Sequence, residues 1–211
     1  MSDPFQRMVL LPGMGATSAM YGPPWRELDG LRLVDWPLYG GERTIAELAR
    51  RIVDGHGLVA DDLPAGSSLG GMVSLEIAAL VGAPRVVLIG SAEHPKEVQS
   101  FFRLVAPLAK VTPMGMAQVL ALSSSGEPGR QFASADKEFL RAMCLAISSW
   151  EPPDYPGEVV RVHGAKDAII ACPKDAHVIP KAGHLVAQTH GEATIAVIRE
   201  ALGGVEAGGG A

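Results

Sequence analysis

Cysteine is scarce in this sequence, which has only Cys144 and Cys172 among its 211 residues. Two cysteines cannot form the disulfide framework of a small secreted protein, and neither stands in a Cys-x-x-Cys pair of the kind that binds zinc. We therefore expect two reduced thiols, no metal site and no other cofactor. Aromatic residues make up only 5% of the chain, so the core must be built mainly from aliphatic side chains and methionine.

Clusters of basic residues are also missing, and the formal net charge is -5. Polyphosphate partners need a concentrated positive surface, so we expect no binding to nucleic acid. Long apolar runs are lacking as well, and the first apolar run, Met8–Leu11, is too short for an export signal or a membrane span. These features favour a soluble, cytoplasmic protein that acts on a small molecule. They leave its oligomeric state unknown.

The chain does contain an alternation of short apolar runs with longer segments of helical periodicity, in a length that suits one catalytic domain. This alternation is typical of an α/β fold, in which a mainly parallel sheet carries helices on both faces. About six strands are predicted, at Met8–Leu11, Leu31–Trp36, Leu63–Ser67, Arg85–Gly90, Glu158–His163 and Ala176–Ile179. Helices are predicted at Thr44–Val53, where Thr44 and Glu47 have the spacing of a capping box, at Leu69–Val81 and at about Ala193–Leu202.

The region 93–150 interrupts this alternation. It has apolar helical patterns at Val98–Leu108, Met114–Leu122 and Lys137–Ile147. Helices inserted between two strands are typical of a cap above the carboxyl edge of the sheet, where open α/β folds bind ligands. We therefore expect residues 1–92 and 151–202 to form the core, 93–150 a helical cap and the glycine-rich 203–211 a disordered tail.

The sharpest chemical signal is Gly66-Ser67-Ser68-Leu69-Gly70-Gly71, between a predicted strand and a predicted helix. An abrupt turn of this kind needs small neighbours and presents its central side chain, Ser68, at the tip. Ser68 is therefore the candidate nucleophile. Pro64 lies in the preceding strand, although a central strand tolerates proline poorly. Either Pro64 sits at the very start of the strand, or the pairing there is irregular.

A serine needs a base to take its proton, so one of the six histidines must lie in a loop that reaches Ser68. His184 ends the glycine-bearing loop Pro180–His184, directly after a predicted strand, and is the candidate base. The remaining histidines are better explained as structural or solvated residues: His56, His94, His163, His177 and His190.

A catalytic histidine in turn needs a carboxylate that holds its tautomer and stabilises its cationic form. Asp167 lies just beyond the predicted strand Glu158–His163, which places it at the same sheet edge as Ser68 and His184. Its alternative role is to cap a helix. Glu93, just past another strand, is a possible substitute acid.

Backbone amides for an oxyanion hole are expected from two loops. The amide of Leu69 stands at the start of a predicted helix, where the helix dipole favours negative charge. The second donor should come from Leu11-Pro12-Gly13-Met14-Gly15, where the glycines allow the amide of Met14 to turn inward.

With these segments placed, the chain resembles the α/β-hydrolase fold family from Met8 to about Leu202. The resemblance is carried by the Gly66–Gly71 elbow, the His163-Gly164-x-x-Asp167 segment, the Gly183-His184 pair and the chain order Ser, Asp, His. It implies a Ser68/Asp167/His184 triad, an oxyanion hole from Met14 and Leu69, and acyl transfer as the reaction. The chain is most similar to small bacterial carboxylesterases, including those similar to pimeloyl-carrier methyl esterases, which implies hydrolysis of a small-molecule ester or thioester with a small or medium apolar acyl group.

Two features depart from the family pattern. Pro12-Gly13 stands where the family commonly has His-Gly, which removes a side-chain hydrogen bond but leaves the Met14 amide. The first, antiparallel strands of the family are also missing, so the sheet should be smaller than usual and essentially parallel.

An apolar acyl pocket is expected from Met14 and from side chains of the region 93–150, namely Phe101, Phe102, Met114, Met116 and Met143, because methionine suits an adaptable binding surface. The same side chains would equally serve to pack the cap onto the core.

Two other functions compete with this interpretation. Gly13–Ser18 approaches a dinucleotide fingerprint, with Asp35 at the end of the next strand, and would suit an NAD(P)-dependent oxidoreductase. Ser18 replaces the third glycine, however, and Pro23-Pro24 would interrupt the required helix. The other alternative is a catalytically silent member of the fold that binds a small molecule or a protein.

Overall fold

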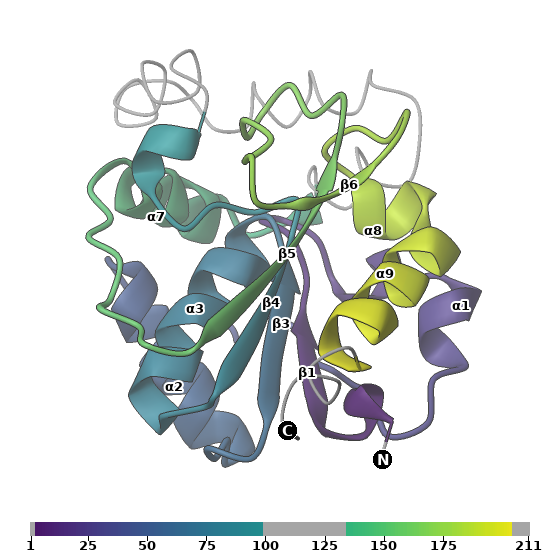
Figure 1. The fold of residues 1–211 in the computed structure, drawn as a ribbon. Helices are drawn as coiled ribbons and strands as arrows, with labels where there is room; N and C mark the ends of the chain where they lie inside the picture. The colour runs from purple at the N-terminus through teal and green to yellow at the C-terminus, as the bar shows by residue number, and fades with distance from the viewer. Residues whose placement is uncertain (1–2, 99–133, 204–211) are drawn as a thin grey trace.

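The computed structural model describes residues 3–98 and 134–203. Within these ranges six strands form one parallel sheet in the order β2-β1-β3-β4-β5-β6 (Figure 1). The strands are β1 (Met8–Leu11), β2 (Arg32–Leu33), β3 (Leu63–Ser67), β4 (Arg85–Ile89), β5 (Glu158–Gly164) and β6 (His177–Ile179). The prediction of about six strands in an essentially parallel sheet is confirmed.

Helices cover both faces of this sheet, as the sequence predicted. One face carries α2 (Ile45–His56), α3 (Leu69–Val81) and α7 (Lys137–Ser148). The other carries η1 (Pro4–Arg7), η2 (Ser18–Met20), α1 (Pro23–Arg26), α8 (Val186–Thr189) and α9 (Gly191–Gly203). A further short 3-10 turn, η3 (Pro95–Glu97), follows β4.

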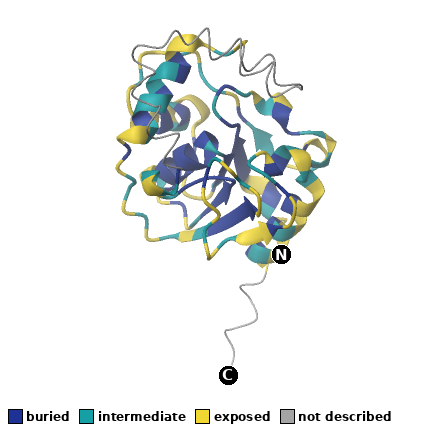
Figure 2. Ribbon diagram, turned by 90° about the horizontal axis from the view of Figure 1, so that it is seen from above, coloured by how far each residue is buried: buried dark blue, intermediate teal, exposed yellow. Residues whose placement is uncertain are grey.

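The strand side chains alternate between two cores, one on each face of the sheet. On β1, Val9 and Leu11 pack in the core beneath α2 and α3, whereas Met8 and Leu10 pack in the core beneath α9. All four are buried, and Figure 2 shows buried residues through the middle of the molecule with exposed ones outside. Burying a side chain of this size contributes about 1.5–3 kcal/mol, which explains why this strand is a continuous apolar run.

The predicted capping box determines where α2 begins. The Thr44 hydroxyl accepts the Glu47 amide, and the Glu47 carboxylate accepts the Thr44 amide. The helix continues past the predicted end at Val53 to His56 and stops at Gly57, whose φ of 60° is left-handed.

The second strand is shorter than predicted, since only Arg32–Leu33 of the expected Leu31–Trp36 is strand. Beyond it, Val34 still donates its amide to the Leu10 carbonyl. Asp35 then accepts the Ser18 amide, and the Trp36 indole donates to the Gly13 carbonyl. These side-chain contacts take the chain out of the edge ladder, so periodicity alone overestimated the strand.

Pro64 is the second residue of β3 and pairs only with β1, where it lies opposite Val9. Pairing with β4 begins one residue later, at Ala65. Pro64 is therefore not at the very start of the strand, and its pairing with β1 is regular, but it precedes the part of β3 that pairs on both sides. The missing N–H therefore costs no bond to β4.

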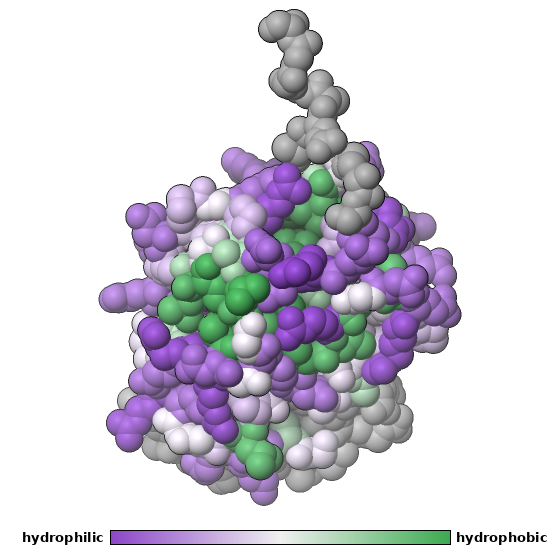
Figure 3. Space-filling view, turned by 90° about the horizontal axis from the view of Figure 1, so that it is seen from below, coloured by the Kyte–Doolittle hydropathy of each residue, from purple (hydrophilic) through white to green (hydrophobic). Residues whose placement is uncertain are grey.

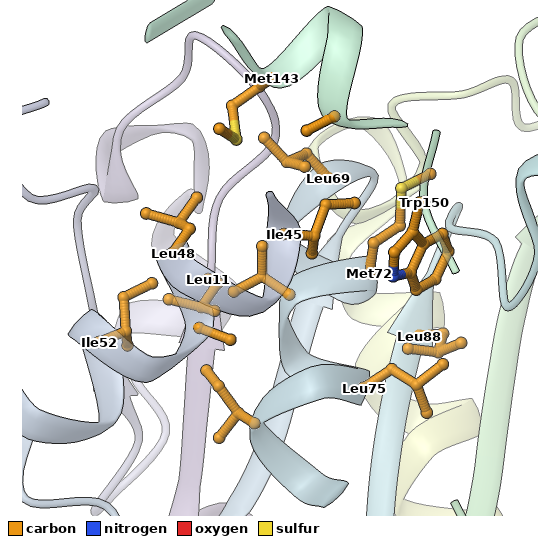
Figure 4. Packing of buried hydrophobic residues seen from close by; sticks show 14 of the residues in the cluster. Leu11, Ile45, Leu48, Ile52, Leu69, Met72, Leu75, Leu88, Met143 and Trp150 are labelled. Carbon is orange, nitrogen blue, oxygen red and sulfur yellow. The ribbon is translucent and has the colours of Figure 1, made fainter. Parts of the chain in front are cut away.

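The helix α7 agrees closely with the predicted Lys137–Ile147. Its buried side chains, Phe139, Leu140 and Met143 among them, belong to the same core as α2 and α3. Figure 4 shows Met143 above Leu69 in this core. The other patterns expected to form the cap, 98–108 and 114–122, lie largely or wholly outside the described residues, as does the tail from residue 204.

The end of the molecule opposite the strands' carboxyl ends has polar and apolar groups mixed over its surface (Figure 3). In the part of the chain that the structure describes, none of the helices combines the length and apolar character needed to cross a bilayer.

Candidate active site

The three predicted triad residues come together at one edge of the sheet. Ser68 directly follows β3, Asp167 lies in the loop after β5, and His184 lies in the loop after β6. Because the strands are parallel, their carboxyl ends meet at this edge, at the top of Figure 1. Open α/β sheets bind their ligands at this edge.

Ser68 has a strained backbone conformation, with φ 54° and ψ -120°. Residues with a Cβ rarely adopt it, and it costs about 1–3 kcal/mol. The turn is possible because its neighbours are glycines. A Cβ on Gly66 would lie under 3.0 Å from the backbone of Gly70, and one on Gly70 would lie equally close to the Leu11 carbonyl. The expected requirement for small residues is therefore confirmed.

A second serine, which the sequence did not single out, holds this turn in place. Ser91 is 1% exposed, and its hydroxyl donates to the Ser68 carbonyl oxygen at 2.6 Å. The same carbonyl accepts the amides of Gly71 and Met72. A Cβ on Gly71 would clash with the Ser91 side chain, so the helix and the end of β4 approach closely here. No local motif marks Ser91, because its role depends on sheet pairing.

His184 connects the other two residues of the predicted triad. Its Nδ1 lies 2.9 Å from Asp167 Oδ2, and its Nε2 lies 3.0 Å from Ser68 Oγ. A carboxylate oxygen only accepts, so Nδ1 carries the proton and donates it to Asp167. Nε2 is then free to accept the Ser68 hydroxyl. The ring is 14% exposed, so a substrate can approach it.

The Asp167 side chain is fully buried and has donors near both of its oxygens. The amides of Ile169 and Ile170 donate to Oδ1 at 2.8 and 3.0 Å. Oδ2 faces the imidazoles of both His184 and His163. Burial alone would raise the pKa of this carboxyl group. The hydrogen bonds from the two histidines, the charge of His184 and the Ile170 amide outweigh burial and hold the pKa of Asp167 well below its ordinary 3.8.

The loops that bear Asp167 and His184 are packed backbone against backbone. Lys166 donates its amide to the Ala182 carbonyl at 2.8 Å. A Cβ on Gly164 would lie 2.6 Å from that same carbonyl oxygen. Gly90, at the end of β4, has φ 52°, and a Cβ there would lie 2.9 Å from the His184 carbonyl. Only glycine fits this close approach, so the carboxylate and the imidazole are held by main-chain contacts.

The two residues predicted to supply oxyanion amides come from segments next to Ser68: Leu69 follows it in the chain, and Met14 follows Gly13. Gly13 approaches closely enough that a Cβ on it would contact the Ser68 Cβ at 3.7 Å. Met14 follows in a turn closed by the Ala16 amide on the Gly13 carbonyl, at 3.1 Å. Leu69 is the first residue of α3, so its amide has no acceptor within the helix. Their role in an oxyanion hole stays a prediction.

Glu93 lies in an ion-pair cluster on a buried arginine. Arg161, 5% exposed, contacts Glu93 at 2.9 Å and also contacts Glu97 and Asp175. Burial raises the pKa of Glu93, and the charge of Arg161 opposes that effect. Of the two candidate acids, Asp167 is the one in contact with His184.

Most of the expected acyl-pocket residues lie outside the described part of the chain, namely Phe101, Phe102, Met114 and Met116. Met143 is fully buried in the core, and Met14 is half-buried against it. Their contact with a substrate stays a prediction.

The segment Gly13–Ser18 does not have the structure that dinucleotide binding requires. It leads into the short turn η2 rather than a long helix, and α1 after it spans only Pro23–Arg26. Asp35, which would bind the ribose, accepts the Ser18 amide instead. The loop instead brings Gly13 next to Ser68.

A groove elsewhere on the molecule has no assigned function. An open groove of about 640 Å³ lies between α1 and α9, and none of the triad residues lines it. Among the described residues, no group of three or more His, Cys, Asp and Glu side chains is placed to hold a metal ion.

Comparisons with known proteins agree with this fold. A model of the alpha/beta hydrolase family matches residues 8–197. No curated protein sequence matches the chain. Among solved structures, a thermophilic esterase from Thermogutta terrifontis has a TM-score of 0.70 at 20% identity, over 94% of this chain and 89% of its own.

Two further solved structures are similar in fold. An enol-lactonase from Burkholderia xenovorans has a TM-score of 0.65 at 19% identity, over 93% of this chain and 90% of its own. The RedJ thioesterase of the prodiginine pathway in Streptomyces coelicolor has a TM-score of 0.64 at 18% identity, over 94% and 90%. With the family model matching most of its length, the chain belongs to the alpha/beta hydrolase family.

Proposed function

We propose that this protein is a serine hydrolase that cleaves a carboxylic ester or thioester through an acyl-enzyme on Ser68. The observation that carries the proposal is the hydrogen-bonded series from Ser68 Oγ to His184 Nε2, at 3.0 Å, and from His184 Nδ1 to Asp167 Oδ2, at 2.9 Å. A hydroxyl, an imidazole and a buried carboxylate in this order form the arrangement that activates serine.

In the first half-reaction Ser68 Oγ attacks the substrate carbonyl carbon while its proton passes to His184 Nε2. The carbonyl oxygen becomes an oxyanion, for which the amides of Leu69 and Met14 are the proposed donors. His184, now cationic and stabilised by Asp167, gives the proton to the departing alcohol or thiol. The carbon–oxygen or carbon–sulfur bond breaks, and the acyl group stays on Ser68.

The second half-reaction repeats these steps with water. Water attacks the acyl-enzyme while His184 takes a proton from it. His184 then gives that proton to Ser68 Oγ as the carboxylic acid leaves. The Asp167 carboxylate keeps its charge throughout. Its low pKa suits this role, since it does not itself take up the proton.

The proposed acyl group is small or medium and apolar. Leu185 directly follows the base and is 39% exposed, and Leu38, two residues beyond Trp36, is 90% exposed. Both follow strands at the end of the sheet that bears the site, where an apolar side chain suits an apolar acyl group better than a charged one. The esterase, the enol-lactonase and the thioesterase to which the chain is similar in fold are each named for acyl chemistry.

The proposal can be tested with p-nitrophenyl esters of increasing acyl length and with matching acyl thioesters. We expect Ser68→Ala to reduce kcat by about a thousandfold or more, because the nucleophile is lost. Ser67→Ala is the matched control, since Ser67 is the buried serine next to it, and should keep most of the activity. The acyl length with the highest kcat/KM measures the size of the pocket.

Turnover that survives Ser68→Ala would contradict the proposal. A folded wild-type protein without turnover on any of these substrates would favour the catalytically silent alternative.

A further inference from the structure

A second imidazole, that of His163, contacts the carboxylate of the proposed triad. His163, the residue before the end of β5, lies with its Nε2 3.1 Å from Asp167 Oδ2. The same Nε2 lies 3.2 Å from the Ile170 carbonyl oxygen. Both neighbours are acceptors, so Nε2 must carry a proton. His163 is 1% exposed, which places this donor out of reach of water.

The contact matters because His163 and His184 share one oxygen. Oδ1 of Asp167 is taken by the amides of Ile169 and Ile170. Oδ2 therefore divides its negative charge between the two imidazoles, and each donor weakens what the other receives. With donors at both oxygens, the carboxylate plane is fixed and Oδ2 points at His184.

We propose that His163 is a positioning residue of this site, which fixes the Asp167 carboxylate and limits how strongly that carboxylate holds the proton of His184. The inference rests on the proposed Ser68 triad. It does not make His163 a catalytic residue, because it touches neither Ser68 nor the proposed oxyanion amides.

The charged groups near His163 are already paired or neutral, apart from Glu93, so they do not account for an effect of His163 on the pH profile. Arg161 lies two residues before His163 on β5, and its charge is matched by Glu93, Glu97 and Asp175. On the loop before β6, burial first and the charge of Asp167 second raise the pKa of the Cys172 thiol, which keeps that thiol neutral. Glu93 is the group to control for, since burial raises its pKa.

The test is the pH profile of kcat/KM in three variants at position 163. His163→Leu removes the donor, His163→Gln restores an N–H at the reach of Nε2, and His163→Asn carries the same amide one carbon too short. Without the donor, more of the Asp167 charge acts on His184 and favours its protonated form. The active, unprotonated base then forms only at higher pH.

We expect His163→Leu and His163→Asn to lower kcat by about tenfold and to move the acidic limb of the profile up by roughly half a pH unit or more. His163→Gln should recover most of the activity and return the limb toward its wild-type position. Melting temperatures and near-ultraviolet circular dichroism of each variant identify any that fails to fold. If His163→Leu does not fold, the comparison of His163→Gln with His163→Asn still tests the proposal.

An acidic limb that stays in place in both Leu and Asn variants would overturn the proposal, even if their activity falls, since that is the result of a packing role. A shift of the same size in Glu93→Gln would also overturn it. These outcomes differ from failure of the proposed function, which is turnover in Ser68→Ala and does not depend on residue 163.

Discussion

Asp167 is the residue whose surroundings determine most of the proposed chemistry at this site. Its side chain is fully buried, yet its pKa is lowered, because four donors stabilise the ionised form. A buried carboxylate without such donors would be neutral at pH 7 and could not hold the His184 tautomer. The sequence indicated Asp167 through its position after a strand, but it did not reveal the His163 contact.

Replacing Asp167 with Asn should therefore lower activity more than it changes the fold. An amide can donate to Nδ1 and so favour the tautomer that cannot accept the Ser68 proton. We expect kcat to fall by roughly a thousandfold or more while a measurable activity remains, because the imidazole is still in place. Steady-state kinetics checks this result. Activity within threefold or so of the wild type would show that Asp167 does not orient the base.

Two glycine-to-alanine substitutions distinguish a glycine that is required because a Cβ has no room from one that only lowers helix propensity. Gly70→Ala should impair folding and activity, because the added Cβ meets the backbone of Leu11 and Pro12 and would push β1 away from the elbow. Gly55→Ala is the matched control in α2, where nothing lies within 4 Å of the added Cβ. It should stabilise the protein by about 0.5–1 kcal/mol.

Thermal melts and activity assays of Gly70→Ala and Gly55→Ala measure these effects on stability and turnover. A Gly70→Ala protein as stable and active as the wild type would show that the close approach at the elbow is not required.

At the scale of elements, local signals predicted well where they determine structure by themselves. The bounds of β3 and α3 agree with the sequence, because the glycines at the elbow and Gly82 at the end of α3 mark them. The predicted extent of β2 was wrong, because the side chains of Asp35 and Trp36 form hydrogen bonds with Ser18 and Gly13 in the loop after β1. Ser91 was missed as part of the candidate site because its contact with Ser68 depends on the pairing of β3 with β4, which sequence periodicity does not report. His163 was missed although Asp167 lies only four positions further along the chain, because spacing alone does not show that the two side chains meet.

A contact between α3 and the end of α7 provides a test at this scale. The Trp150 indole donates to the Glu76 carboxylate at 2.7 Å, and Glu76 is 6% exposed. Burial raises the pKa of Glu76 above its ordinary 4.5, and the Trp150 hydrogen bond only partly opposes this. The folded state thus binds the proton more tightly than the unfolded state, so this group costs stability as pH rises from about 4.5 through the folded pKa.

Glu76→Gln removes that cost and keeps an oxygen that accepts the indole N–H. We expect a higher melting temperature at about pH 8, by roughly 2–4 °C for about 1 kcal/mol, and little change at about pH 4. Differential scanning calorimetry at the two pH values measures the difference. An equal shift at both pH values would mean that charge burial is not its cause.

At the scale of the whole molecule, the sheet brings together residues that are far apart in the chain. Ser68 and His184 are separated by 116 positions, and their contact exists because β3, β5 and β6 end at the same edge. The family resemblance and the chain order predicted this convergence. The sequence could not define the acyl pocket, because the expected cap side chains follow no local rule that fixes where they point.

The most direct test of this convergence is to locate the adduct formed with a fluorophosphonate by peptide mass spectrometry, in folded protein and in protein unfolded by urea. If three distant loops together activate one hydroxyl, a single adduct should form on the peptide that contains Ser68, and only in the folded protein. An adduct on another residue, or one that forms equally in urea, would show that the folded sheet does not activate Ser68.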